Sequence, residues 1–213
     1  MKKTINARFI TVAAVMLAMN MVAPVIPFVP IFFLPTMIAA TLLGLKMTLF
    51  VSVSFGLVSV IYSFILPTTI VGLAFQHAPY LAIVPRIVAA LGAYIVFIAL
   101  SKGLEQTNLN KNLKAVLPIS IAAATGSILN TALVVSGFII IVPDVYFGGI
   151  TILLALPTML ISGLIEFILL AVITPPIVIT LKKVMGVRFL SQISPSLYKI
   201  DYDFNDDLVY NED

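Results

Sequence analysis

Three polar side chains in an otherwise apolar sequence are the strongest candidates for chemistry: Arg86, Asn130 and Glu166. Arg86 follows Pro85 and separates two charge-free stretches. A guanidinium in such a place can bind a carboxylate through two parallel hydrogen bonds. Charged groups in or near a membrane usually face an interior or a site. These residue types therefore predict a polar site for a small carboxylated ligand.

Each of the three has a second interpretation. Arg86 can reach the outer lipid headgroups as a snorkelling arginine. The pair Asn130 and Thr131 can form an interhelical hydrogen bond of about 0.6 kcal/mol, as is common in membrane bundles. Glu166 can be protonated, or paired with a hydroxyl group or with Arg86. Both interpretations stay open for Asn130, Thr131 and Glu166, whereas ligand binding is favoured for Arg86.

Four further residues are candidates at the edge of this site. Gln76, His77 and Tyr80 lie in a segment that we expect to be an outer loop, either as a polar lid or as plain surface. Phe32 belongs to the proline-rich loop 24–35, which is either a cap over the ligand or an interfacial anchor. His77 is the only histidine, so a metal site is not expected.

The composition decides what kind of elements carry these residues. The chain is 61% hydrophobic and 10% charged, against roughly 45–50% and about 25% in a soluble domain. A water-soluble fold is therefore excluded. A membrane span needs about 20 residues, and prolines divide the longest apolar stretches. The sequence predicts an all-α membrane protein with six transmembrane helices, at about 8–23, 32–45, 47–66, 83–101, 115–141 and 157–184.

The positive charges predict the orientation of these six helices. With both termini in the cytoplasm, eleven of the twelve Lys and Arg residues lie inside, and Arg86 is the exception. The net charge of +3 hides an acidic end: residues 195–213 carry six acids and one lysine. We therefore expect a membrane domain over 1–194 and an acidic cytoplasmic tail over 195–213, and no nucleic-acid partner.

Helix geometry predicts that the three polar residues meet. At 1.5 Å per residue, Asn130 lies about 22 Å above the inner end of its helix and Glu166 about 13 Å below the outer end of the last one. Arg86 stands at the outer mouth of its helix. All three fall in the outer half of a roughly 30 Å membrane core. We also expect Pro175 and Pro176 to kink the last helix.

Several activities have no sequence signature here. The chain lacks a phosphate-binding loop, a nucleophile elbow, a metalloprotease helix and any cysteine, so we expect no enzyme, cofactor or metal. No repeat of the first three spans in the last three is visible, and buried acids are few. An ion-coupled secondary transporter is therefore an alternative with weaker support.

The combination of motifs resembles the S-components of energy-coupling factor (ECF) transporters, which are small membrane proteins that capture vitamins. The similarity covers most of the chain. It consists of the size and six spans, Ala14-x-x-x-Ala18 in the first helix, Pro85-Arg86, Asn130-Thr131, and Glu166 before Pro175-Pro176.

This resemblance implies partners and a substrate. The partners would be a transmembrane scaffold subunit, which docks on Ala14 and Ala18, and two ATPase subunits. The loaded protein would rotate in the bacterial plasma membrane to deliver its vitamin, with Arg86 and Asn130 at the substrate. The sequence is most similar to the pantothenate type, and folate or another small carboxylated vitamin is the alternative.

Overall fold

The described part of the chain is almost entirely helical. The computed structural model describes residues 7–22, 32–65, 70–143, 146–147 and 150–193. Apart from helices it contains one two-stranded hairpin, in which β1 (Tyr146–Phe147) pairs antiparallel with β2 (Ile150–Thr151). The predicted all-α class is confirmed. Residues 24–31 of the proline-rich loop and the acidic tail 195–213 lie outside the described residues.

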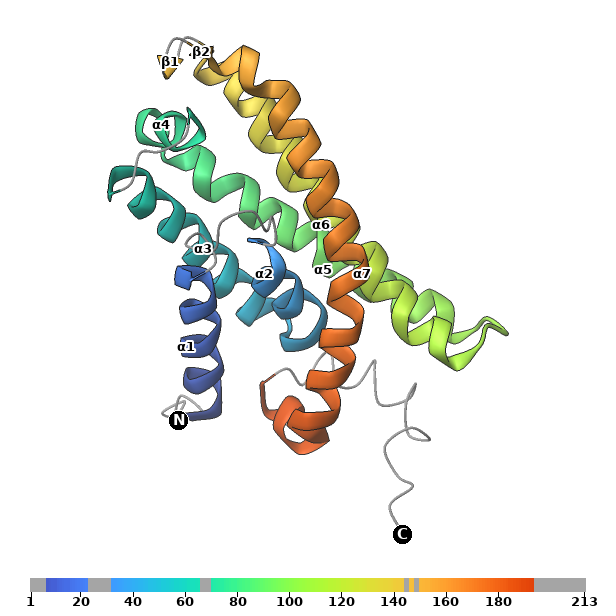
Figure 1. Cartoon of the computed structure of the whole chain (residues 1–213). Coiled ribbons are helices and arrows are strands. Elements are labelled where there is room, and N and C mark those ends of the chain that lie inside the picture. The colour runs from blue at the N-terminus through green and yellow to red at the C-terminus, as the bar shows by residue number, and fades with distance from the viewer. Residues whose placement is uncertain (1–6, 23–31, 66–69, 144–145, 148–149, 194–213) are drawn as a thin grey trace.

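Within the described residues, four helices are long and apolar enough to cross a membrane. They are α3 (Leu45–Ile65), α5 (Tyr80–Glu105), α6 (Lys111–Ile141) and α7 (Ile152–Ile193), of which the apolar part is Leu153–Gly186. Figure 1 shows α5, α6 and α7 as the longest elements, lying side by side. Charged residues are confined to the ends of these helices except for Arg86 and Glu166. The coarse prediction of a membrane protein is therefore supported.

Two further apolar helices are shorter than a span. The first is α1 (Ala7–Val22), and the second consists of α2 (Leu34–Ile38) and η2 (Ala39–Leu43), a turn of π-helix. They coincide with the first two predicted spans, although one continuous helix was expected over 32–45. Both are shorter than the roughly 17–25 residues of a typical span. The number of six spans stays a prediction.

The structure corrects the segment before Arg86. The region with Gln76 and His77, predicted as a loop, contains α4 (Ile70–His77), and α5 begins at Tyr80 rather than near 83. Pro79 immediately precedes α5 with helical backbone angles, which suits a residue whose ring fixes φ. Arg86 therefore lies inside a helix, two turns from its start, and not at its mouth.

The predicted kink at Pro175 and Pro176 is wrong in its position. Both prolines lie within α7 on a helical backbone, and the non-helical residue inside α7 is Gly186, with φ 66° and ψ 158°. Such a positive φ favours glycine, because it has no Cβ. Neighbouring helices and local adjustments allow prolines to stay in membrane helices. The direction of the chain consequently changes ten residues after the second proline.

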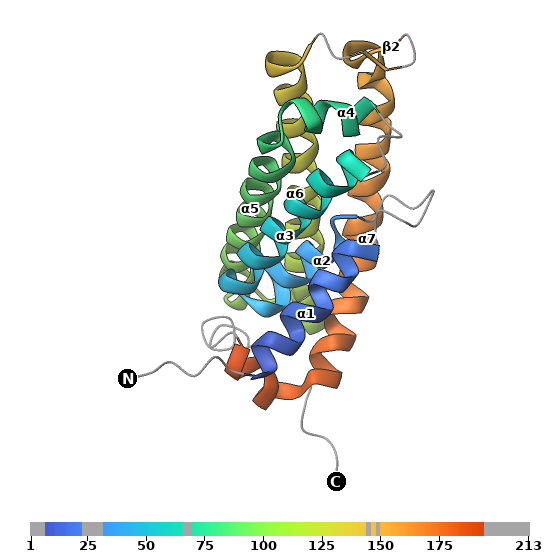
Figure 2. The same cartoon turned by 90° about the vertical axis from the view of Figure 1, so that its left-hand side faces the viewer.

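Other helix ends have local causes. Gly44, with φ 81°, ends η2 and starts the turn into α3. Asn110 precedes α6 and its Oδ1 accepts a hydrogen bond of 3.0 Å from the Asn112 backbone N–H, which is an N-cap. The start of α1 and the end of α7 lie at the same end of the molecule, whereas α4 and the β-hairpin lie at the other (Figures 1 and 2).

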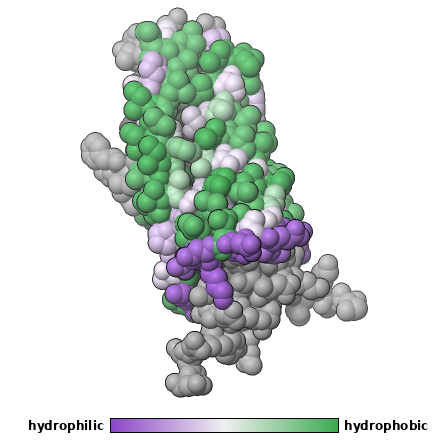
Figure 3. All heavy atoms as spheres, turned by 90° about the vertical axis from the view of Figure 1, so that its right-hand side faces the viewer, coloured by the Kyte–Doolittle hydropathy of each residue, from purple (hydrophilic) through white to green (hydrophobic). Residues whose placement is uncertain are grey.

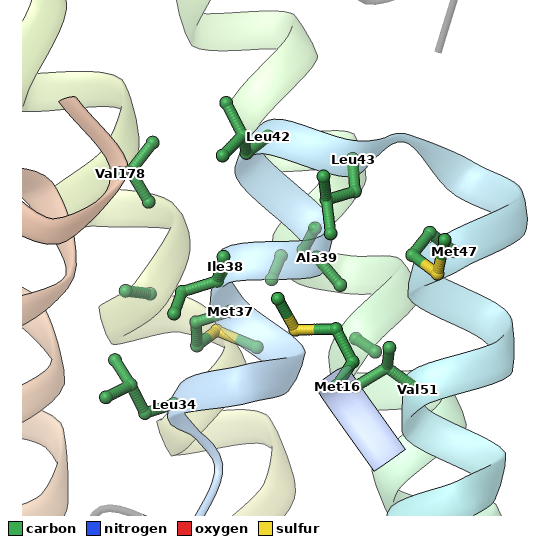
Figure 4. Close-up of a cluster of buried hydrophobic side chains, with 14 of the residues drawn as sticks. Met16, Leu34, Met37, Ile38, Ala39, Leu42, Leu43, Met47, Val51 and Val178 are labelled. Carbon is green, nitrogen blue, oxygen red and sulfur yellow. The ribbon is translucent and has the colours of Figure 1, made fainter. Parts of the chain in front are cut away.

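The core lies around α2 and η2. Figure 4 shows side chains from α1, α2, η2, α3 and α7 that converge there, and Phe33, Met37 and Met47 are completely buried. A smaller apolar cluster joins α4, α5 and α6 at the other end. On the outside, Figure 3 shows a broad apolar surface that ends at a hydrophilic band. This division is typical of a protein that contacts lipid tails and headgroups.

Candidate functional site

Arg86 is buried inside the helix bundle, with 8% of its surface exposed. Its Nη1 donates a hydrogen bond to the Ala82 carbonyl one turn earlier in α5. Helical side chains lean toward the N-terminus of their helix, which makes this contact natural. Its Nε is also buried but has no hydrogen-bond partner. This burial contradicts a snorkelling arginine, since no headgroup is within reach of a buried side chain.

Two phenylalanines hold the guanidinium of Arg86. Its Cζ lies 4.4 Å from the ring centroid of Phe55 in α3 and 5.2 Å from that of Phe75 in α4. Both distances are within the range of cation–π attraction. Phe75 in turn packs against Phe138 of α6, with ring centroids 5.5 Å apart. The arginine is therefore held by rings from two helices, α3 and α4, besides its own carbonyl contact, and α6 supports the second ring.

Glu166 faces the same region from α7. Its Oε1 accepts a hydrogen bond of 3.4 Å from the backbone N–H of Phe33, the residue that precedes α2. An N–H at a helix start has no partner within its helix, so a carboxylate there satisfies it. Glu166 also interacts electrostatically with Arg86. The ring centroids of Phe33 and Phe55 are 6.1 Å apart. The residue that binds Glu166 therefore lies next to a ring that contacts Arg86.

Asn130 and Thr131 lie on α6, which packs against both α5 and α7. An added Cβ on Gly163 of α7 would be 2.6 Å from Cγ2 of Thr131, so the two helices touch at this level. Asn130 is adjacent to this contact, and Glu166 is three residues, or about 4.5 Å, beyond Gly163 along α7. The Oδ1 atom of Asn130 is buried without a hydrogen-bond partner. Asn130 and Glu166 thus lie at neighbouring levels of the contact between α6 and α7, and Glu166 interacts with Arg86, whereas the meeting of all three residues stays a prediction.

The other candidates are more peripheral. Gln76 donates through Nε2 to the Ser63 carbonyl and so ties α4 to α3. His77 is exposed at the end of α4, and Tyr80 is 50% exposed at the start of α5. Phe32 is half-buried and packs against the apolar core. The structure gives these four residues no contact with the charged groups that it describes.

The small residues of α1 are on its open face. Ala14 and Ala18 are both exposed, one helical turn apart, whereas Val12, Ala13 and Met16 are buried. Residues four apart share a helix face. The two alanines therefore lie side by side on a surface that the described chain does not cover.

Sequence analysis missed the aromatic part of the site. Phe55 and Phe75 have no polar atom, and in a chain with 14 phenylalanines nothing distinguishes a ring beneath a guanidinium from a ring in lipid. The one neighbouring residue that helps is Gly56, which allows α3 to approach α5 closely. Its importance can be recognised only after the helices are placed. An added Cβ on Gly56 would lie 2.8 Å from the Ile83 Cα.

Among the described residues, no group of three or more His, Asp or Glu side chains lies together in a way that could hold a metal ion. No protein-family model and no curated protein sequence matches this chain. The function is therefore inferred from the residues and geometry of the site.

Proposed function

We propose that the protein is the substrate-capture subunit of an ECF-type vitamin transporter. It would cross the bacterial plasma membrane six times, with both termini in the cytoplasm and with α1 and α2–η2 as short or tilted spans. The apolar long helices and the positions of the lysines support this proposal. ATP hydrolysis would be performed by two partner subunits, since the chain has no phosphate-binding loop.

The observation that carries the proposal is the arrangement of Arg86. Nη1 is engaged by the Ala82 carbonyl, and the two phenyl rings hold the plane of the guanidinium. Nε, which has no partner, lies on the same edge as Nη2. This edge is one of those through which arginine binds a carboxylate with two parallel hydrogen bonds. The side chain is thus pre-organised for a ligand carboxylate, which reduces the entropy lost on binding.

The ligand that fits these features best is a small flexible carboxylate. Pantothenate has one carboxylate for Arg86, and its amide and hydroxyl groups could be met by Asn130 and Glu166. Folate also has carboxylates, but its flat ring system needs a stacking surface, and Phe55 and Phe75 are already occupied by the guanidinium. Pantothenate is therefore the first ligand to test.

The exposed alanines support a docking role for α1. Small residues allow two helix backbones to approach closely in a membrane. We propose that Ala14 and Ala18 contact the transmembrane scaffold subunit. Replacing both with leucine is expected to leave vitamin binding unchanged, because they are remote from Arg86, and to abolish uptake by the assembled complex. Retained uptake would contradict this role.

The test of the function is a comparison of binding with uptake. Purified full-length protein in lipid nanodiscs is titrated with pantothenate, folate and other water-soluble vitamins by calorimetry. It is then placed in proteoliposomes with an ion gradient but without partner subunits. Saturable binding without uptake is the expected result. Concentrative uptake by the chain alone would instead establish an ion-coupled secondary transporter.

A further inference from the structure

Four oxygen-bearing side chains lie on neighbouring helices of the bundle, and two of them, Asn130 and Glu166, are also proposed above to meet the ligand. They are Thr36 of α2, Ser127 and Asn130 of α6, and Glu166 of α7, and are called the oxygen cluster below. Thr36 and Ser127 are completely buried. Thr36 Oγ1, Ser127 Oγ and Asn130 Oδ1 have no hydrogen-bond partner. A buried polar group without a hydrogen bond destabilises the fold, so the arrangement requires an explanation.

The missing hydrogen bonds distinguish Thr36 and Ser127 from the majority of the buried hydroxyl groups. Five of the eight buried Ser and Thr side chains in the described part of the chain donate to a carbonyl three or four residues earlier, as Thr41 does to Met37 at 2.8 Å and Thr48 to Gly44 at 2.9 Å. Such local bonds are within reach of a Ser or Thr that has a full helical turn before it, which holds for Ser127, whereas Thr36 is the third residue of α2. Thr36 and Ser127 do not form them, which leaves their oxygens available to another partner.

Helix register places Ser127 opposite Glu166. The side chain of Thr131 rests on Gly163, which fixes the level at which α6 and α7 touch. Ser127 is four residues before Thr131 and Glu166 three residues after Gly163, each on the face of its helix that contains the contact. Because α6 and α7 are antiparallel neighbours, these two steps go in the same direction (Figure 1). Asn130 lies within the same turn.

The start of α2 brings Thr36 to the same place. The Phe33 N–H is bonded to Glu166, and the Met37 side chain would be 2.8 Å from a Cβ on Gly126. Thr36 lies between these two contacts with α7 and α6. The oxygen cluster therefore combines a carboxylate, an amide oxygen and two hydroxyl groups from three elements.

Oxygen ligands of this kind bind hard cations, and the charges favour a monovalent one. Arg86 and Glu166 together have no net charge, so a ligand carboxylate leaves one negative charge in the bundle. An uncompensated charge in a low-dielectric interior is costly. We propose that Thr36, Ser127, Asn130 and Glu166 form a Na⁺ site that is filled together with the carboxylate on Arg86. The joint filling rests on the proposed function, whereas the cation site itself does not.

Binding of ²²Na⁺ to the purified full-length protein in nanodiscs, without any vitamin, tests the site. We expect saturable binding that unlabelled Na⁺ displaces and choline does not. Ser127→Ala should weaken it about tenfold or more, as loss of a group at a metal site generally does. Thr174→Ala is the matched control. Thr174 Oγ1 is equally buried and unpartnered, but it lies eight residues, or about 12 Å, beyond Glu166 along α7.

Each failure has a distinct meaning. Absence of saturable ²²Na⁺ binding in the wild type overturns the site, as it would if the cluster held only water. An equal loss in Thr174→Ala overturns the assignment of the ligands, since it would indicate a general effect on the bundle. Thermal melting of both variants shows whether they fold.

The link with the vitamin is measured separately. Pantothenate is titrated in Na⁺ and in choline, and Na⁺ is expected to tighten binding about tenfold or more in the wild type but not in Ser127→Ala. If the affinity for pantothenate is equal in both salts and one proton is bound with each pantothenate, a proton compensates the charge of the carboxylate. This result would overturn the joint filling by Na⁺ and carboxylate. Binding of ²²Na⁺ without binding of any vitamin would reject the proposed function and leave the cation site intact.

Discussion

The methionine core around α2 and the site around Arg86 solve opposite packing problems within one bundle. In the core, Met16, Met37 and Met47 fill the space between α1, α2 and α3 with flexible apolar side chains (Figure 4). The Thr41 and Thr48 hydroxyl groups near it are all bonded to backbone carbonyls. Asn20 Nδ2 also donates to the Val51 carbonyl at 3.0 Å, whereas Asn20 Oδ1 and Thr36 Oγ1 have no hydrogen-bond partner, so most but not all polar groups of this core are satisfied.

Around Arg86 the same bundle leaves polar atoms without partners. Nε of Arg86 and Oδ1 of Asn130 are buried and unbonded, although the rings of Phe55 and Phe75 are well placed. Natural interiors satisfy most buried polar groups, and exceptions need a specific reason. The two regions therefore differ chiefly in charge. The second holds a buried guanidinium and a carboxylate, as expected of a region that receives a ligand, whereas the first has apolar side chains with neutral hydroxyl and amide groups. Substitutions in each region should therefore affect different measurements.

The largest effect is expected from Arg86→Ala. Removing one partner of a buried, charged, hydrogen-bonded pair costs about 2–4 kcal/mol of binding free energy. Pantothenate affinity, measured by calorimetry, should fall by the corresponding factor.

Arg86→Lys sharpens this prediction. Lysine keeps the positive charge but lacks the planar edge that binds a carboxylate with two bonds, so its affinity should lie between those of the wild type and Arg86→Ala. Unchanged affinity in both variants would remove Arg86 from the ligand site and leave it as a partner of Glu166 alone.

Met47→Ala is expected to destabilise the fold by about 2–3 kcal/mol without a comparable loss of affinity. This is the lower part of the range for soluble cores, because lipid is as apolar as the core and the cost comes mostly from the cavity. Unfolding in mixed detergent measures the stability. A loss of binding as large as that of Arg86→Ala, in a variant that stays folded, would contradict the separation of the two regions.

Much of this architecture is encoded in patterns that can be read from the sequence. Charge-free stretches located α1, α3, α5 and α6, because a charged residue at a helix centre is costly in lipid. The same reasoning identified Arg86 and Glu166 as unusual, since each interrupts an apolar stretch. The candidate site was therefore predictable in its charged residues.

Other features depend on contacts that no local pattern contains. The eight-residue α4 lies between two prolines, and that context gave no reason to distinguish a short helix from a loop. Pro175 and Pro176 stay helical, whereas the chain leaves the helix at Gly186, where the missing Cβ permits φ 66°. Phe55 and Phe75 became recognisable only when α3 and α4 were placed against α5.

Two glycine substitutions compare the tightness of the regions. Gly56→Ala brings a Cβ to 2.8 Å from the Ile83 Cα, where only a shift of the backbone can relieve the clash. We expect a loss of about 1–3 kcal/mol in stability and weaker pantothenate binding, because Phe55 moves with α3. Gly126→Ala meets the flexible end of Met37 at 2.8 Å and should cost less than Gly56→Ala. A reversed order in the unfolding experiment would contradict this comparison.

The smallest effects come from removing one hydroxyl group in each setting. Thr41→Val keeps the shape but deletes a bond to the Met37 carbonyl, and should cost about 1 kcal/mol of stability. Thr174→Val deletes a buried hydroxyl group that has no partner, so it should be neutral or stabilising. Both threonines are buried, and both changes are isosteric, so the difference between them isolates the hydrogen bond. Equal destabilisation by the two variants would mean that the Thr174 hydroxyl group is hydrogen-bonded in the membrane. The lack of a partner for a buried hydroxyl group would then not distinguish a site that receives a ligand from the core.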